Sequence, residues 1–334
     1  MDQLSKKDRF TITISLKSIA LFTLIPLCIY LLWIVKDLIF SLLIGFILMS
    51  ALKPAVNFLS SKKLSRTLAV ILVYLLFILF IIALFSLIIP PIIYETSVLI
   101  MSLPYAIEDL IPQISNFVNI SDLTSFVPNV TTNIFSIISS IFSNALFVIT
   151  TLFFGLYFLL EENLWEKTIG TYFKKETSNR IISIIEKVEK RMSSWFWGEL
   201  TLMTVVGLLT FLGLHLIGMG KYAIPLAVLA GLLEVVPNIG PVISAIPAII
   251  LGFVYSSFTG FVALALYVVV QQLENTLIVP LIMKHAVGLN PILTLVALIL
   301  GGRLGGILGV LLAIPLFLVI ETIVSELLHQ NNKS

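Results

Sequence analysis

The chain has 334 residues, of which 59% are hydrophobic and only 11% are charged, and its mean hydropathy is +1.11. Average soluble domains carry about 25% charged and about 45–50% apolar residues. A soluble enzyme is therefore excluded, because a globule could not bury this excess of apolar side chains. Intrinsic disorder is excluded as well, since it requires low hydrophobicity and high charge. The net charge of +2 gives no reason to expect a nucleic-acid partner.

The first apolar run extends from 18 to 35 and is about as long as a membrane-spanning helix requires. It lacks the short core and small-residue cleavage site of a secretory signal, so we expect an uncleaved transmembrane helix. Further apolar runs follow at about 38–52, 67–93, 134–160, 199–217, 222–255, 257–280 and 291–326. All are longer than the 9–11 residues of a membrane β-strand. The predicted fold class is an all-α polytopic membrane protein with about eight hydrophobic segments.

The loops between these runs differ in charge, and the difference predicts the orientation of the chain. The loop 53–66 carries four bases and no acid, whereas 94–133 carries four acids and no base. The stretch 161–194 carries seven bases beside six glutamates. Because loops rich in Lys and Arg stay in the cytoplasm, we expect a cytoplasmic N-terminus and an extracytoplasmic 94–133.

Three regions follow from this pattern. Residues 1–160 would form N-terminal membrane helices, with 94–133 as an amphipathic segment on the extracytoplasmic surface of the membrane. Residues 161–194 have apolar side chains at helical spacing among charges, which predicts one cytoplasmic amphipathic helix. Residues 195–334 would form a membrane region with broken helices, of the kind found in transporters.

The run 222–255 is too long for one spanning helix and too short for two. Its middle, from Glu234 to Pro241, contains two prolines, which remove backbone donors, and Gly240, which permits a tight turn. Irregular backbone at membrane depth is tolerated only when it is buried in protein or lines a water-filled cavity. We therefore expect two half-helices that meet at a re-entrant tip.

The last run, 291–326, has the same length problem and is interrupted by glycines that include Gly301, Gly302 and Gly309. Each broken run follows an intact helix, which suggests an internal repeat. In transporters, such broken helices meet at a substrate site near the bilayer midplane. The alternative for Gly301, Gly305 and Gly309 is a stripe of small residues that lets helices pack closely.

Four polar residues interrupt the apolar run 257–280. Gln271, Glu274 and Asn275 are spaced to share one helix face, and Gln272 lies beside them. Their oxygens would suit a cation or a polyol, and an intramembrane carboxylate usually marks an ion or substrate pathway. Glu199, by contrast, is expected to stabilise a nearby helix start. The candidate binding residues are Glu234, Asn238, Gly240, Gln271, Gln272, Glu274, Asn275, Gly301 and Gly302.

Signatures of catalysis are absent from the sequence. It contains no glycine-rich phosphate loop, no HExxH and no GxSxG motif, and its three histidines are far apart in sequence. The single cysteine, Cys28, supports neither a disulfide nor a cysteine metal site. We expect no cofactor, no metal site and no enzymatic activity.

Several motifs in a fixed order carry a resemblance to a known family: Glu234-x-x-Pro237-x-x-Gly240-Pro241, Gln271-x-x-Glu274, Leu289-x-Pro291 and Gly309-x-x-x-Ala313-x-Pro315. Together they resemble the autoinducer-2 exporter family of bacterial permeases. The resemblance implies a self-associating secondary transporter of the cytoplasmic (inner) membrane. Its substrate would be a small polar solute such as the furanone-type signal autoinducer-2, or sodium or lithium exchanged against protons.

Both carboxylates, Glu234 and Glu274, would suit a proton- or cation-linked step. The amides and backbone groups would equally suit a hydroxylated solute. From the residues alone, a membrane scaffold that transports nothing stays a further alternative.

Overall fold

The computed structural model describes residues 22–24, 26, 27, 30, 31, 33–86, 90, 145–161, 163–283 and 291–331. None of these residues forms a strand, so the predicted all-α class is confirmed. The predicted segment 94–133 lies outside the described residues. In chain order the helices are α2 (Lys36–Ser61), an unlabelled helix (Arg66–Ser86), α5 (Ala145–Leu160), α6 (Leu164–Tyr172), α7 (Lys175–Leu216), α8 (Gly220–Leu233), α9 (Ile239–Tyr255), α10 (Ser257–Leu273), the π-helix η2 (Glu274–Ile278), α11 (Val279–Met283) and α12 (Pro291–Asn331).

Five described helical stretches are long and apolar enough to cross a membrane. They are α2, Arg66–Ser86, α7, the continuous stretch Ser257–Met283 and Ile292–Leu328. The pair α5 and α6, bent by 86°, would make a sixth span if it crosses as one unit, and α8 and α9 are shorter apolar helices. This is a polytopic helical membrane protein.

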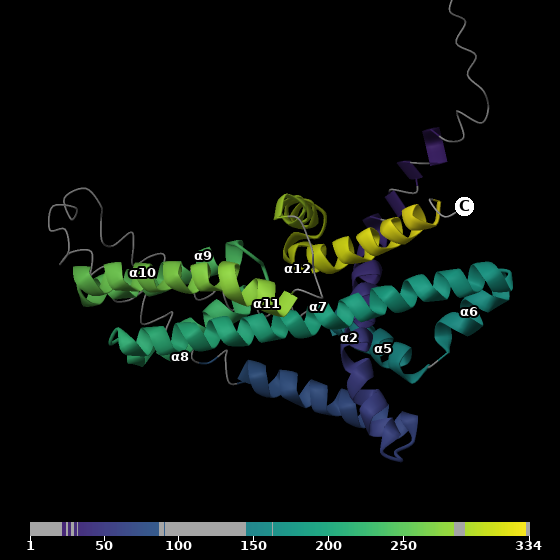
Figure 1. The fold of residues 1–334 in the computed structure, drawn as a ribbon, viewed down its shortest axis with the longest axis horizontal. Coiled ribbons are helices and arrows are strands. Elements are labelled where there is room, and N and C mark those ends of the chain that lie inside the picture. Colours follow the sequence, from purple (N-terminus) through teal and green to yellow (C-terminus); the bar gives the residue numbers. More distant parts are fainter. Residues whose placement is uncertain are drawn as a thin grey trace, which may run out of the picture.

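The helix α7 runs through the whole molecule (Figure 1). Its 42 residues span about 63 Å at 1.5 Å per residue. The sequence predicted one helix within 161–194 and another from 199, but the structure divides 161–194 between α6 and α7, and α7 continues to Leu216. The break falls at Phe173 and Lys174, both extended, whereas α7 contains no proline that would end it.

The second half of α7 packs with α8, α9 and α10 as an antiparallel four-helix bundle (Figure 1). Gly218, with φ of 83°, lies in the turn between α7 and α8. At the end of α9, Ser256 caps α10 by accepting a hydrogen bond from the Thr259 N–H at 3.0 Å. The bundle core is apolar and rich in alanine, with Ala223, Ala230, Ala248 and Ala263 fully buried.

The predicted break within 222–255 is present. The helix α8 ends at Leu233 and α9 begins at Ile239, so the two form a hairpin inside the bundle. The five residues between them form the tip, which lies at the end of the bundle opposite the Gly218 turn (Figure 1).

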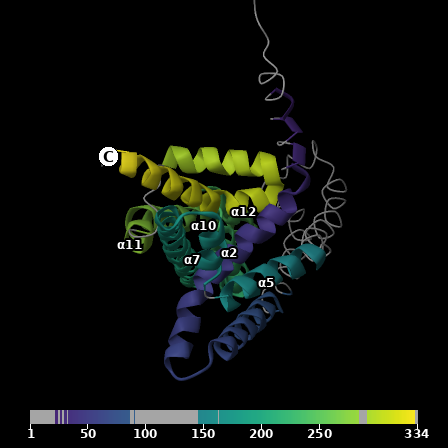
Figure 2. The same ribbon diagram turned by 90° about the vertical axis from the view of Figure 1, so that its right-hand side faces the viewer.

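The last run is a second helical hairpin. At Gly306 the backbone of α12 leaves the helical region, with φ of 59° and ψ of −138°, and the two limbs lie side by side (Figure 2). The limbs touch at Gly301 and Gly309: a Cβ on Gly309 would lie 1.9 Å from the Gly301 carbonyl oxygen. These glycines therefore bring two backbones into contact.

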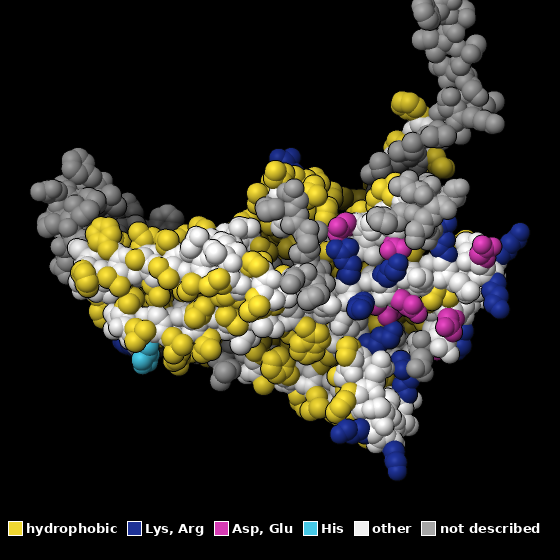
Figure 3. All heavy atoms as spheres, in the orientation of Figure 1, with side chains coloured by type: hydrophobic (Ala, Val, Ile, Leu, Met, Phe, Trp, Pro, Cys, Tyr) yellow, Lys and Arg dark blue, Asp and Glu magenta, His cyan; other side chains and the backbone are white. Residues whose placement is uncertain are grey.

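Charged side chains gather at one end of the molecule, over α6, the first half of α7 and the 61–66 turn, while apolar side chains cover the rest of the visible face (Figure 3). At this end Glu189 of α7 pairs with Lys53 of α2 at 2.5 Å and accepts a hydrogen bond from the Trp165 indole at 2.9 Å. Arg191 pairs with Glu321 at 2.7 Å. We call these five residues the polar belt; they join α7 to α2, α6 and α12.

Candidate functional site

A cavity of about 390 Å³ lies where the bundle meets α11 and α12. It is bounded by the middle of α7, the α8–α9 tip, η2, α11 and both limbs of α12. The lining residues are Trp195, Glu199, Leu202, Glu234, Pro237, Asn238, Glu274, Asn275, Val279, Met283, Thr294 and Ile314.

Three glutamates from three separate elements meet at this cavity. Glu199, Glu234 and Glu274 are 5%, 2% and 4% exposed. The carboxyl groups of Glu234 and Glu274 lie within hydrogen-bonding distance of each other, and Glu199 is close enough to interact electrostatically with both. We call these three residues the carboxyl cluster.

The carboxyl cluster has no basic partner among the residues that the structure describes. Within them no Lys, Arg or His lines the cavity, and one oxygen of each carboxyl group is buried without a hydrogen-bond partner. Within the same residues, no group of three His, Cys, Asp or Glu is arranged to hold a metal ion. Buried charges are normally paired, so an unpaired cluster of this kind points to a role other than stability.

The tip owes its shape to two residues. Asn238 has φ of 65° and ψ of −35°, and a positive φ is one that Asn adopts more readily than most side chains. A Cβ on Gly240 would lie 1.8 Å from the Leu233 carbonyl oxygen, so only glycine allows the chain to pass this close to the end of α8. Together they place Glu234 and Asn238 at the cavity.

Glu274 owes its position to a π-turn. The helix α10 changes to the π-helix η2 at this residue, which is buried, while the following Asn275 is exposed. Such short π-helical turns are frequent at functional sites, because they shift the face on which the next side chains lie. The single shared face predicted for Gln271, Glu274 and Asn275 is therefore altered from Glu274 onward.

The structure brings together four of the nine predicted candidates: Glu234, Asn238, Glu274 and Asn275. Gly240 supports the tip without lining the cavity. The exposed side chain of Gln272 donates to Thr276 at 3.1 Å, and Gln271 does not line the cavity either.

The remaining two candidates lie elsewhere. Gly301 lies at the contact between the limbs of α12, beside an apolar hollow that also contains Phe40. Gly302 faces Val310 of the opposite limb. From the last run, Thr294 and Ile314 line the cavity, whereas the predicted glycines Gly301 and Gly302 do not.

Sequence reasoning missed Glu199, Trp195 and Thr294. The expectation that Glu199 stabilises a helix start was wrong, because α7 begins 24 residues earlier, at Lys175. The sequence feature that could have identified Glu199 is its isolation, because the next ionisable residue along the chain is His215.

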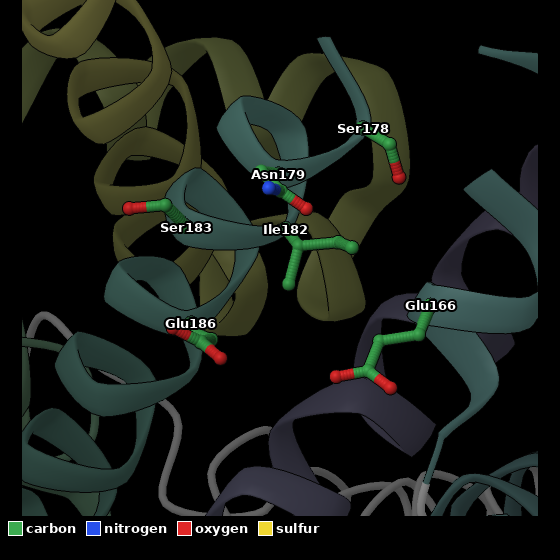
Figure 4. Close-up of a pocket in the computed structure, with 6 residues that line it drawn as sticks. All are labelled: Glu166, Ser178, Asn179, Ile182, Ser183 and Glu186. Atoms are coloured by element: carbon green, nitrogen blue, oxygen red, sulfur yellow. The ribbon is translucent and has the colours of Figure 1, made fainter. Parts of the chain in front are cut away.

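A second hollow, of about 440 Å³, lies at the charged end of the molecule. Glu166 of α6 extends toward a face of α7 that carries Ser178, Asn179, Ile182, Ser183 and Glu186 (Figure 4). Its nearest lining residue is 13 positions from Glu199, about 20 Å along α7, so it is separate from the carboxyl cluster.

A polytopic helical protein whose broken helices surround a buried polar cavity has the architecture of a membrane transporter. Comparison with known proteins agrees: the model of the AI-2E family transporter matches residues 21–329. The chain is similar to "Putative transport protein YueF" of Bacillus subtilis, with 30% identity over 86% of this chain and 83% of the relative. It is also similar to the AI-2 transport protein TqsA of Escherichia coli, with 22% identity over 68% and 66% of the two chains. The chain belongs to the AI-2E transporter family.

Proposed function

We propose that this chain is a secondary transporter that carries a small, uncharged, hydroxylated solute through the cavity at the carboxyl cluster. The observation that supports this most is the meeting of three buried, unpaired carboxyl groups from α7, the tip and η2. Autoinducer-2 is the first solute to test, because the relative TqsA is named for its transport.

The chemistry of the lining favours a solute with several hydroxyl groups. A carboxyl group accepts hydrogen bonds and, when it is protonated, also donates one, so the cluster would exchange hydrogen bonds with solute hydroxyls. Asn238 and Asn275 add amide donors and acceptors. A volume of about 390 Å³ lies within the usual range for small-molecule sites, about 300–1,000 Å³.

We propose that transport is linked to protons. If all three carboxyl groups in the cavity were ionised, their negative charges would repel one another and be costly to bury, since no base among the described residues lines the cavity. Protons bound by the cluster would relieve this repulsion, so a change in its proton occupancy would accompany solute binding. The alternative of sodium or lithium exchange has no support in the names of the relatives, and we do not propose it.

The location that we propose is the bacterial inner membrane, with a cytoplasmic N-terminus. The polar belt and the basic 61–66 turn lie at the same end of the molecule (Figure 3), and basic regions remain in the cytoplasm. Self-association, which the family resemblance implies, stays a prediction.

Transport by purified protein in liposomes tests this proposal. Autoinducer-2 flux is measured with and without a pH gradient for the wild type and for Glu199→Gln, Glu234→Gln and Glu274→Gln. We expect each variant to lose at least tenfold in flux or to lose its response to the gradient. The matched control is Glu176→Gln, an exposed acid at the start of α7, which should behave as the wild type. Wild-type flux and pH response in all three cluster variants would contradict the proposal.

A further inference from the structure

Two hydroxyl groups are buried without partners inside the four-helix bundle. Thr210 of α7 is 1% exposed and Tyr267 of α10 is 7% exposed. Within the described residues neither hydroxyl has a hydrogen-bond partner. A buried hydroxyl left unpaired destabilises the fold, so each needs an explanation.

Thr210 differs from three other threonines of the long helices. Thr201 and Thr204, earlier in α7, donate to the carbonyl oxygen four residues back at 2.7 Å, and Thr322 of α12 does so at 2.6 Å. This bond is the ordinary one for a threonine within a helix. Thr210 does not make it, although the same backbone geometry offers it, so its hydroxyl is turned into the bundle. Thr151 of α5 is the other buried threonine without a partner among the described residues, and it lies outside the bundle.

Both hydroxyls lie in register with the carboxyl cluster. Thr210 is 11 residues from Glu199, which is three helical turns, and Tyr267 is seven residues from Glu274, which is two turns. Each therefore lies on the same helix face as its glutamate, about 16 Å and about 10 Å along the axis. Because α7 and α10 are antiparallel neighbours (Figure 1), both positions lie in the same direction from the cavity, toward the Gly218 turn and Ser256.

The helices of the bundle approach each other closely around these positions, and small side chains fill much of their interface. Its buried residues include Ala223, Ala230, Ala248 and Ala263, whose methyl groups interlock little with their neighbours. Leu202 lines the cavity on this side, and Val206 and Val270 follow between it and the hydroxyls; all three are buried. In this conformation apolar side chains therefore close the space between the carboxyl cluster and the two hydroxyls.

We propose that Thr210 and Tyr267 form a second polar site on the solute path, where they exchange hydrogen bonds with solute hydroxyls between the cavity and the Gly218 end of the bundle. The inference rests on the proposed function, since it assumes that a hydroxylated solute leaves or enters the cavity. It adds the direction of the path and the two residues that define it. Both hydroxyls find partners only when the path opens.

Near-isosteric substitutions test the proposal. Thr210→Val and Tyr267→Phe remove the hydroxyls and little else, and Thr151→Val removes an equally buried, unpartnered hydroxyl away from the path. All three variants should unfold thermally at or above the wild-type temperature, because each loses an unpaired polar group. Flux in liposomes should fall at least tenfold for Thr210→Val and Tyr267→Phe but stay at the wild-type rate for Thr151→Val. Wild-type flux in both path variants, or an equal loss in Thr151→Val, would overturn the inference.

A second measurement does not depend on the solute. With Cys28 replaced by serine, a cysteine at position 210 is exposed to a small hydrophilic thiol reagent added from either side of the membrane. Labelling that is faster from the side opposite the polar belt supports the path, even if autoinducer-2 is not transported and the proposed substrate fails. Absence of labelling from that side, with a cysteine at the exposed position Ser256 labelled as positive control, contradicts it.

Discussion

Single residues determine the geometry of the tip, and Gly240 is the clearest case. The space for a Cβ at this position is taken by the backbone of Leu233, which cannot rotate away as a side chain can. Two helix ends would have to separate to admit even a methyl group, and Glu234 would move with them.

We predict that Gly240→Ala lowers the free energy of unfolding by about 1–3 kcal/mol, the usual cost of overpacking, and reduces flux. The midpoint of thermal unfolding in detergent and the flux in liposomes measure the two effects. Gly170→Ala in α6 is the control, because the nearest atom to its Cβ would be 4.0 Å away, and alanine favours a helix by up to about 1 kcal/mol over glycine. Equal stability of the two variants would contradict the prediction.

Part of the carboxyl cluster was predictable at this scale. Glu234 and Glu274 stand out because an acid in an apolar run is costly unless it has a function. Glu199 carries the same signal, but its meaning depends on where α7 begins. Trp195 and Thr294 carry no signal of their own, since an indole and a hydroxyl are common in apolar helices, and only the crossing of α7 with α12 places them at the cavity.

At the scale of the elements, the two helical hairpins show which sequence patterns fix a fold. Breaks within 222–255 and 291–326 were predictable from length together with proline and glycine. The continuity of α7 was not, because the pattern changes near 195 from amphipathic to uniformly apolar, which resembles a boundary between two helices. A helix that passes from one environment to another shows no residue in its sequence that says whether it continues. Only a helix-breaking residue would indicate an end.

The α12 hairpin should also be sensitive to the size of its glycines. We predict that Gly309→Ala separates the limbs, because its Cβ would meet the Gly301 carbonyl, and lowers the unfolding midpoint in detergent. Leu304→Ala, an exposed side chain on the same hairpin, should leave the midpoint nearly unchanged. A stable Gly309→Ala variant would show that the limbs do not depend on this contact.

For the whole molecule, the distribution of charge predicts which side of the membrane each end faces. The segment 94–133 has four acids and no base, so it should be extracytoplasmic. With Cys28 replaced by serine, a cysteine at Ser121 should be labelled by an impermeant thiol reagent in intact cells. A cysteine at the exposed position Asn179, at the charged end, should be labelled only after the membrane is opened. The reverse pattern would invert the topology and, with it, the direction of the path.

Because α7 is one unbroken helix, a movement at the cavity would be transmitted to the other end of the helix. Glu199 and the polar belt residues Glu189 and Arg191 belong to one rigid rod, so they cannot move independently. Since about 36 Å of helix separates Glu199 from Lys175, a tilt of about 10° at the cavity would displace the start of α7 by about 6 Å. A solute that tilted α7 at the cavity would therefore also move α6 and the charged end of the molecule.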